Sequence, residues 1–502
     1  MSEPYYITTA ISYPNGKPHI GHAYEAIAAD AMARFRRAQG RDVRLVTGTD
    51  EHGLKMVQTA RAAGRETKEY ADEMSGYFRQ MCDDLNISYD AFVRTTEPRH
   101  YEASKAIWTA MEAAGDLYLD RYEGWYSVRD EAFYDESELV EGDDGEKLSP
   151  QGTPVEWTVE ETWFFRLSKY QDRLLALYRD NPDFIRPESR RNEVIRFVEG
   201  GLKDLSVSRT SFDWGVPVPR SPGHVMYVWV DALTTYMTGV GYAQDEAEYA
   251  RYWPADVHLI GKDIVRFHAV YWPAFLMSAG LPLPKQVFGH GFLLARGEKM
   301  SKSLGNVVDP MELAARFGVD QLRYFLLREI SFGQDGSYSS EAIVNRANSE
   351  LANSFGNLAQ RSLSMIFKNL NGVLPAMGEA AEDQALLAQV DEACAELERE
   401  FDRFSFSTGL EAWMAAVFAC NQYFASSEPW ALKKSDPQRM ADILGTAVAA
   451  VRKLALAVQP VIPASAEKLI ALIDSGQGGE PIAQPTPIFP KLELPADEEE
   501  AA

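Results

Sequence analysis

Residues 5–50 read YYITTAISYPNGKPHIGHAYEAIAADAMARFRRAQGRDVRLVTGTD, a pattern that predicts a strand, a long helix and a second strand. We expect the strands at 6–11 and 43–47, and the helix at 20–39. Strands joined through a helix are parallel and follow a right-handed crossover. A strand followed by a glycine and a helix is expected again near 257–261. The sequence therefore predicts an α/β fold with a doubly wound, Rossmann-type parallel sheet.

Two histidines, His19 and His22, stand three residues apart where the long helix should begin. Residues at i and i+3 share a helix face, so both imidazoles can point at one ligand beside the helix N-terminus. That terminus favours phosphate, because it offers free N–H groups and the positive end of the helix dipole. Gly21 leaves room for a flat ring against the backbone. The pattern is typical of an ATP site, and a surface helix with two incidental histidines is the alternative.

A second motif, KMSKS at 299–303, follows an apolar run and a turn. Lys299 and Lys302 can swing onto a triphosphate and neutralise its developing charge. A solvated basic loop is the alternative. The two motifs, in this order and about 280 residues apart, resemble those of class I aminoacyl-tRNA synthetases.

Further stretches carry a closer resemblance. They are AISYPNG at 10–16, TGTDEHG at 47–53, WVDALTTY at 229–236 and IGKDIVRFH at 260–268. They resemble the methionyl-tRNA synthetases, and the likeness runs from about residue 5 to about residue 490. It implies a ligase that activates methionine with Mg²⁺ and ATP to methionyl-adenylate. The same family transfers the methionyl group to the 2′-hydroxyl of the terminal adenosine of tRNA(Met).

The residues themselves favour an apolar, aromatic slot for the amino acid. Four side chains of 229–236 fall at i, i+3, i+4 and i+7, one face of a helix. Such a slot suits a thioether, whose sulfur packs well against ring edges, and a Tyr236 or His268 tip could hydrogen-bond the sulfur weakly. Plain core packing is the alternative. The predicted lining residues are Ile11, Tyr13, Trp229, Ala232, Leu233, Tyr236, Ile264 and His268.

Ligands of parallel sheets bind at the carboxyl ends of the strands, where several polar residues fall. Asp50 ends a predicted strand and can pair with the substrate ammonium, although a helix cap is its alternative. The resemblance implies that Asp263 holds the ribose hydroxyls and that the backbone near Leu293 holds the adenine; a helix cap is again the alternative for Asp263. The predicted ATP-binding residues are Asn15, His19, Gly21, His22, Gly261, Asp263, Leu293 and Lys302, and the predicted catalytic residues are His19, His22, Lys299 and Lys302.

Residues 116–224 hold short aromatic runs between polar turns, which predict a small mixed insert with some antiparallel strands. Many relatives carry Cys-x-x-Cys zinc knuckles in this insert. Here Trp125, Tyr126, Ser127 and Val128 stand about where the first pair would be, so we expect no structural zinc and expect aromatic packing in its place. The chain has 3 cysteines, widely spaced, which argues against a disulfide framework and a Cys₄ zinc site.

From about residue 338 the pattern is helical, with segments at 341–369, 383–403, 407–425 and 437–474, and predicts an α-helix bundle. Asparagine and arginine can read the edges of splayed bases, and an exposed tryptophan can stack on one. The resemblance implies contacts with a CAU anticodon in this bundle. The alternatives are inter-helix hydrogen bonds for the asparagines and a buried anchor for the tryptophan, which we expect in a loop. The predicted residues are Asn353, Asn357, Arg361, Pro429 and Trp430.

Length and charge set further limits. The 502 residues are enough for about three domains, and the net charge of −24 argues against a surface that binds nucleic acid everywhere, though local basic patches suffice for tRNA. No apolar run approaches a membrane span and no targeting segment is visible, so we expect a cytoplasmic protein. The family's C-terminal dimerisation appendix is absent, so we expect a monomer.

The expected parts are 1–115 and 225–295 (nucleotide-binding catalytic domain), 116–224 (connective insert), 296–340 (KMSKS loop and stem contact) and 341–502 (anticodon-binding bundle with its tail).

Two other functions stay open at this point. One is a sister activity, either another class I synthetase or an amino-acid:thiol ligase on the same catalytic domain. The other is a catalytically silent RNA-binding scaffold derived from a synthetase. The intact histidine and lysine motifs argue against the second, and the thioether-shaped slot argues against the first.

Overall fold

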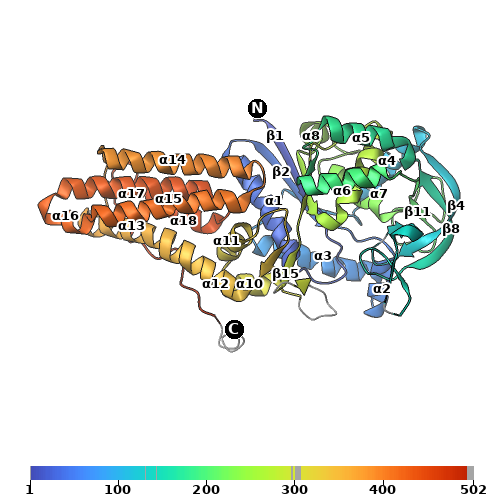
Figure 1. Cartoon of the computed structure of the whole chain (residues 1–502), viewed down its shortest axis with the longest axis horizontal. Helices are drawn as coiled ribbons and strands as arrows, with labels where there is room; N and C mark the ends of the chain where they lie inside the picture. Colours follow the sequence, from blue (N-terminus) through green and yellow to red (C-terminus); the bar gives the residue numbers. More distant parts are fainter. Residues whose placement is uncertain (1, 131, 143, 296–297, 300–306, 495–502) are drawn as a thin grey trace. The chain divides into compact units, whose positions relative to one another are not determined.

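The computed structural model describes residues 2–130, 132–142, 144–295, 298–299 and 307–494 (Figure 1). The chain forms two compact units. The first unit comprises residues 1–29 and 39–290, and the second comprises residues 30–38 and 291–502. No helix in the described part of the chain is both long enough and apolar enough to cross a membrane.

The first unit is built on a parallel sheet, as the sequence predicts. Its strand order is β3-β2-β1-β13-β14-β9, and every neighbouring pair is parallel. The helix α1 (Ile20–Ala38) connects β1 to β2, so the predicted strand, helix and strand are confirmed. The strands are β1 (Pro4–Thr9), β2 (Asp42–Thr49), β3 (Ala91–Arg94), β9 (Ile185–Arg186), β13 (Val257–Gly261) and β14 (Val287–His290).

Apolar residues on both faces of the sheet explain why helices cover it. All residues of β1 after Pro4 are buried, which is typical of a central parallel strand. Among the helices, α3 packs on β2, and α4 packs on both α7 and α9. The helices of this unit outside the insert are α2 (Leu54–Ala62), α3 (Thr67–Asp84), α4 (Pro98–Ala113), α7 (Val228–Thr238), α8 (Glu246–Tyr252) and α9 (Trp272–Ala279), with a π-helical turn at Phe267–Tyr271.

The predicted insert contains an antiparallel sheet in the order β10-β8-β4-β5. Its strands are β4 (Leu117–Ser127), β5 (Ala132–Tyr134), β8 (Glu156–Phe165) and β10 (Leu205–Ser206). Two short hairpins pair β6 (Val140–Glu141) with β7 (Lys147–Leu148) and β11 (Ser208–Arg209) with β12 (Val225–Met226). The helices α5 (Gln171–Asp180) and α6 (Glu188–Glu199) flank β9, which pairs with β14. A strand from within this segment therefore extends the parallel sheet, which the sequence did not predict.

A cluster of buried hydroxyl groups around Asp130 joins the turn after β4 to the turn before β8. The Asp130 carboxylate accepts from the hydroxyls of Ser149 and Thr153, both at 2.6 Å, and of Tyr134 at 3.1 Å. The Ser127 hydroxyl lies 2.7 Å from that of Thr153. Aromatic packing is also present, as we expected near 125–128, but this hydrogen-bonded cluster, absent from our expectation, joins the two turns.

The same cluster does not suit zinc, which prefers thiolate and imidazole ligands. The five residues offer one carboxylate and four hydroxyls, and their atoms already bond one another. Over the described ranges, moreover, no group of three or more His, Cys, Asp and Glu side chains could hold a metal ion.

The second unit is a helix bundle next to a small sheet. In Figure 1, α14, α15 and α17 run side by side, and these three helices pack on one another. The small sheet has the order β16-β15-β17, with β15 (Leu293–Ala295), β16 (Glu298–Lys299) and β17 (Gly336–Tyr338). The helices are α10 (Pro310–Phe317), α11 (Val319–Glu329), α12 (Ser340–Arg346), α13 (Asn357–Asn369), α14 (Ala381–Phe401), α15 (Phe406–Ser427), α16 (Pro429–Ser435), α17 (Pro437–Val458) and α18 (Pro463–Asp474).

Two details of the bundle differ from the prediction. The helix expected at 437–474 is split into α17 and α18, because Pro460 and Pro463 interrupt the backbone hydrogen bonds of a helix. The loop expected at Trp430 is wrong, since Pro429 and Trp430 form the first turn of α16, where proline is well tolerated. In addition, a π-helical segment at Ala347–Gly356 separates α12 from α13.

Candidate active site

The two histidines face one another at the start of α1. Their ring centroids are 3.8 Å apart. The backbone N–H of His19 donates to His22 Nδ1 at 3.1 Å, and the backbone N–H of Gly21 donates to His19 Nδ1 at 3.1 Å. Because both Nδ1 atoms accept hydrogen bonds, the proton of each neutral ring is assigned to Nε2. The site therefore presents two N–H donors near the positive end of a helix, a suitable arrangement for an anion.

Gly21 lies directly against the His19 ring. A Cβ atom at this position would lie 2.9 Å from His19 Cε1, so a larger residue here would make that ring shift. The flat ring that Gly21 accommodates in this structure is thus that of His19 itself. The predicted space against the backbone is present, and a neighbouring side chain occupies it.

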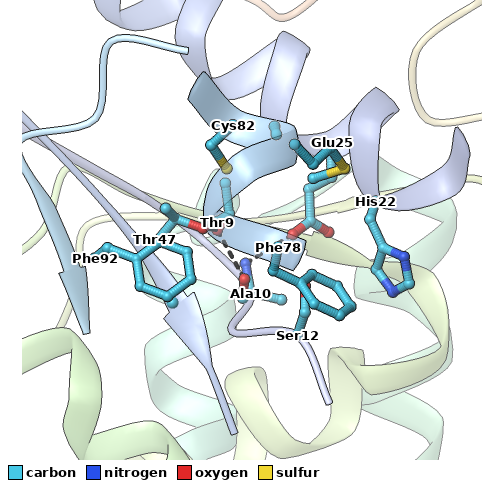
Figure 2. A pocket seen from close by; sticks show the side chains of 12 residues that line it. Thr9, Ala10, Ser12, His22, Glu25, Thr47, Phe78, Cys82 and Phe92 are labelled. Atoms are coloured by element: carbon cyan, nitrogen blue, oxygen red, sulfur yellow. Dashed lines mark hydrogen bonds between the residues drawn. The ribbon is translucent and has the colours of Figure 1, made fainter. Parts of the chain in front are cut away.

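A pocket lies between β1, β2, α1 and α3, and Figure 2 shows His22 and Glu25 on its wall. The Glu25 carboxylate accepts from the Ala10 backbone N–H at 2.9 Å, and its other oxygen lies 2.7 Å from His290 Nε2. Sequence reasoning missed Glu25 and His290, although Glu25 follows His22 at i+3 on the same helix face. The lining residues are Thr9, Ala10, Ser12, His22, Glu25, Ala26, Thr47, Gly48, Phe78, Met81, Cys82 and Phe92.

Tyr236 and His268 form a buried, uncharged pair. The Tyr236 hydroxyl lies 2.6 Å from His268 Nε2, and His268 Nδ1 lies 2.9 Å from the Ile264 carbonyl oxygen. A carbonyl only accepts, so Nδ1 carries the proton and Nε2 accepts from the tyrosine. Burial lowers the pKa of His268 to about 4 even though the bond to Ile264 raises it, and burial raises the pKa of Tyr236 well above its usual value. Both groups are therefore neutral at pH 7.

The predicted aromatic stripe is partly core and partly accessible. Ala232, Leu233 and Tyr236 are buried, whereas Trp229 and Ile264 are half-buried, as are Ile11 and Tyr13. The Trp229 ring stacks on Phe267 with a centroid distance of 3.9 Å and meets His268 edge-on at 5.9 Å. The buried members form a packed wall, and the half-buried members keep part of their surface exposed to solvent.

Asp50 and Tyr13 lie on segments that leave the sheet beside this wall. Asp50 directly follows β2, is 8% exposed and donates its backbone N–H to the Ser12 carbonyl at 2.9 Å. The cap residue of α2 is Gly53, so Asp50 is not a helix cap. The Tyr13 hydroxyl accepts from the Met56 backbone N–H at 2.9 Å.

The remaining predicted nucleotide residues occupy separate places. Asp263 is exposed at the end of β13, and a Cβ on Gly261 would lie 2.7 Å from its carboxylate oxygen, so the carboxylate folds back over the glycine. Asn15 is half-buried in the segment before α1. Leu293 is buried in β15 of the second unit. Lys299 ends β16, while Lys302 lies outside the described residues.

In the bundle, the three predicted polar residues of the 353–361 stretch are all exposed. The Arg361 guanidinium lies 5.0 Å from the ring centroid of Phe424 and 5.6 Å from that of Trp430. Trp430 is 47% exposed, so it is not a buried anchor, whereas Pro429 beside it is buried. An exposed tryptophan beside an arginine can stack on an unpaired base, and the exposed amides of Asn353 and Asn357 can bond the edges of bases.

Comparisons with known proteins define the class and then the family. Residues 5–363 match the sequence model described as tRNA synthetases class I (M), and residues 374–484 match the anticodon binding domain of methionyl tRNA ligase. The chain is 58% identical to the methionine--tRNA ligase of Brucella suis, over 99% of both proteins. It is 57% identical to that of Mycobacterium bovis, over 98% of this chain and 99% of the relative. This chain belongs to the methionine--tRNA ligase family.

A solved structure resembles this chain in both sequence and fold. The Mycobacterium tuberculosis methionyl-tRNA synthetase in complex with methionyl-adenylate matches with a TM-score of 0.94 and 57% identity, over 97% of this chain and 100% of that one. The similarity extends through both units, and it confirms the predicted fold class of a parallel sheet followed by a helix bundle.

Proposed function

We propose that this protein joins L-methionine to tRNA(Met) in two steps. Methionine and ATP first give methionyl-adenylate and pyrophosphate, and the methionyl group then passes to the 2′-hydroxyl of the terminal adenosine. The observation that carries the proposal is near-complete coverage by methionine--tRNA ligases at 58% identity, together with an intact histidine pair at the start of α1.

In the first step an oxygen of the methionine carboxylate bonds to the α-phosphorus, and the bond from that phosphorus to pyrophosphate breaks. A carboxylate is already a nucleophile at pH 7, so catalysis consists of positioning and charge stabilisation. The Nε2 protons of His19 and His22 would bind phosphate oxygens beside Asn15 and Gly21. Mg²⁺ would accompany the triphosphate, and Lys299 and Lys302 would neutralise the leaving pyrophosphate.

The nucleoside and the amino acid would bind on either side of this phosphate position. For the nucleoside, Asp263 next to Gly261 would accept hydrogen bonds from the ribose hydroxyls, and the backbone of Leu293 would pair with the adenine. For the amino acid, Asp50 would pair with the ammonium group through a charge-assisted bond.

The thioether would be recognised by shape and ring-edge packing. The Tyr236 hydroxyl proton points at His268, and the other proton of that pair points at Ile264, so the pair offers its ring edges to the sulfur. The slot would be completed by the residues predicted from the sequence, which are Ile11, Tyr13, Trp229, Ala232, Leu233 and Ile264.

The bundle would read the CAU anticodon. Trp430 and Arg361 would stack with unpaired bases, while Asn353 and Asn357 would bond base edges and Pro429 would set the start of α16. We further propose that the protein acts as a cytoplasmic monomer and that 116–224 forms a connective insert in a catalytic domain made of 1–115 and 225–295. Residues 296–340 would contact the tRNA stem, and 341–502 would bind the anticodon.

The deciding experiment is ATP–pyrophosphate exchange with the purified protein, offering one amino acid at a time. Exchange with methionine alone is expected. Exchange with another amino acid instead would indicate a sister ligase. Absence of exchange with every amino acid, with or without tRNA, would contradict the enzymatic proposal and favour a scaffold.

A further inference from the structure

A carboxylate with no exposure to solvent lies between two histidines in the first unit. One oxygen of Asp231, on α7, lies 2.6 Å from His52 Nδ1, and the other lies 2.6 Å from His100 Nε2. Asp231 and His100 are 0% exposed and His52 is 1% exposed. A buried charge is costly unless it is paired and hydrogen-bonded, so this arrangement needs a reason.

The hydrogen-bonding pattern of the cluster is complete. Burial by itself would raise the pKa of Asp231, but the two imidazoles lower it to about 2, so the carboxylate is ionised and accepts from both rings. His52 Nε2 lies 3.0 Å from the Tyr101 hydroxyl, and His100 Nδ1 lies 2.8 Å from the Thr238 hydroxyl. Each imidazole therefore has a fixed orientation and a partner on both nitrogens.

This cluster connects the two sides of the proposed methionine slot. His52 follows Asp50 by two residues on the segment after β2, and Asp50 is the proposed partner of the ammonium group. Asp231 stands on α7 between Trp229 and Tyr236, which form the proposed side-chain wall. His100 lies on α4, which packs against α7. The hydrogen bond from His52 to Asp231 joins residues 179 positions apart in the chain.

Apolar packing encloses α7, because the helix is buried around most of its circumference. The van der Waals contacts that make up this packing are individually weak and have little directional preference. Hydrogen bonds to a charged group are directional and strong, so a shift of α7 relative to the 50–53 segment would break them. A slot that must hold an ammonium group and a side chain at once depends on that relative placement.

We infer that Asp231, together with His52 and His100, is a positioning residue that holds the Asp50 carboxylate and the α7 wall at the spacing of the amino-acid substrate. This inference rests on the proposed function. It concerns binding of the amino acid and not of ATP, because the cluster joins α7 to the segment that carries Asp50, whereas the histidines that would bind phosphate lie at the start of α1.

The test is the Asp231→Asn variant in methionine-dependent pyrophosphate exchange. The asparagine amide has nearly the shape of the carboxylate. Its NH₂ group, however, would face one of the two imidazole N–H groups that donate to Asp231, so one of the two hydrogen bonds would be lost. We expect the KM for methionine to rise roughly ten- to hundredfold while the KM for ATP changes little. An unchanged methionine KM, or equal rises in both KM values, would overturn the inference.

Two further variants guard against a loss of folding. His52→Asn keeps an N–H group where Nδ1 stood, and His52→Ala removes it. Only the alanine variant should therefore show the raised methionine KM. Equal methionine KM values in the two variants would contradict the positioning role.

The control is Asp383→Asn, which alters another buried carboxylate, bonded to Tyr423 and Arg439 in the bundle. It should lower the melting temperature and leave both KM values unchanged.

The same measurements separate the two levels of the argument. If the unaltered protein shows no methionine-dependent exchange, the proposed function fails and the inference fails with it. If the unaltered protein exchanges normally and Asp231→Asn matches it, the function stands and only the positioning role is lost.

Discussion

At the scale of single residues, hydrogen-bond direction decides what each side chain can contribute. His19 and His22 accept at Nδ1 and so present N–H at Nε2, whereas His268 donates at Nδ1 and accepts at Nε2. The same residue type therefore suits the proposed phosphate site in one place and the proposed methionine slot in another. Burial enforces the second role, because it disfavours the charged imidazolium.

This burial predicts a dependence of stability on pH. The folded pKa of His268, about 4, lies below the ordinary value of 6.5, so the unfolded state binds more protons between these pH values. Stability should therefore fall as the pH drops from 6.5 toward 4, by about 2 kcal/mol from this group at pH 5. Urea unfolding at pH 7 and pH 5, compared between the unaltered protein and His268→Asn, measures it. An identical loss in both proteins would contradict the assignment.

At the scale of elements, the insert is held by side-chain hydrogen bonds at its turns. The Asp130 carboxylate joins the segments that follow β4 and precede β8, because the hydroxyls of Ser149 and Thr153 donate to it. These hydroxyls are buried, so removing Asp130 would take away their charged acceptor and leave them only each other and Ser127 as side-chain partners.

Asp130→Ala should therefore destabilise the insert by about 1–3 kcal/mol. The change should appear as faster hydrogen exchange in β4, β5 and β8. Glu123→Ala is the matched control, because Glu123 forms an exposed ion pair with Arg121 that should matter little. A metal chelator should leave the unaltered protein's exchange unchanged; faster exchange after chelation would mean that a metal, and not this cluster, supports the insert.

At the scale of the whole molecule, the chain divides into two compact units with different proposed tasks. The first holds the histidine pair and the proposed slot, and the second holds the exposed Arg361 and Trp430, which lie over the buried Phe424. Amino-acid activation needs no anticodon, so the two tasks should respond separately to substitution.

Trp430→Ala should raise the KM for tRNA in aminoacylation roughly tenfold, because stacking on one base contributes about 1–3 kcal/mol. Pyrophosphate exchange without tRNA should stay unchanged. Phe418→Ala is the control, since Phe418 is an exposed aromatic of the same bundle, 55% exposed on α15, outside the proposed site. Equal effects of the two substitutions on tRNA would argue against a specific role for Trp430.

Sequence by itself determined the features that depend on neighbours in the chain. The strand, helix and strand of 5–50 and the shared face of His19 and His22 follow from local periodicity, and the motifs identified the family. Local reasoning failed where a proline could either end a helix or begin one, as at Pro429.

Tertiary structure alone decided the contacts between distant segments. The pairing of β9 with β14, the cluster around Asp130 and the bridge from His52 to Asp231 each join residues whose own surroundings in the sequence give no sign of a partner. Burial supplies the physical reason. A buried polar group must find a partner wherever the fold brings one, and spacing along the chain does not reveal which segment that is.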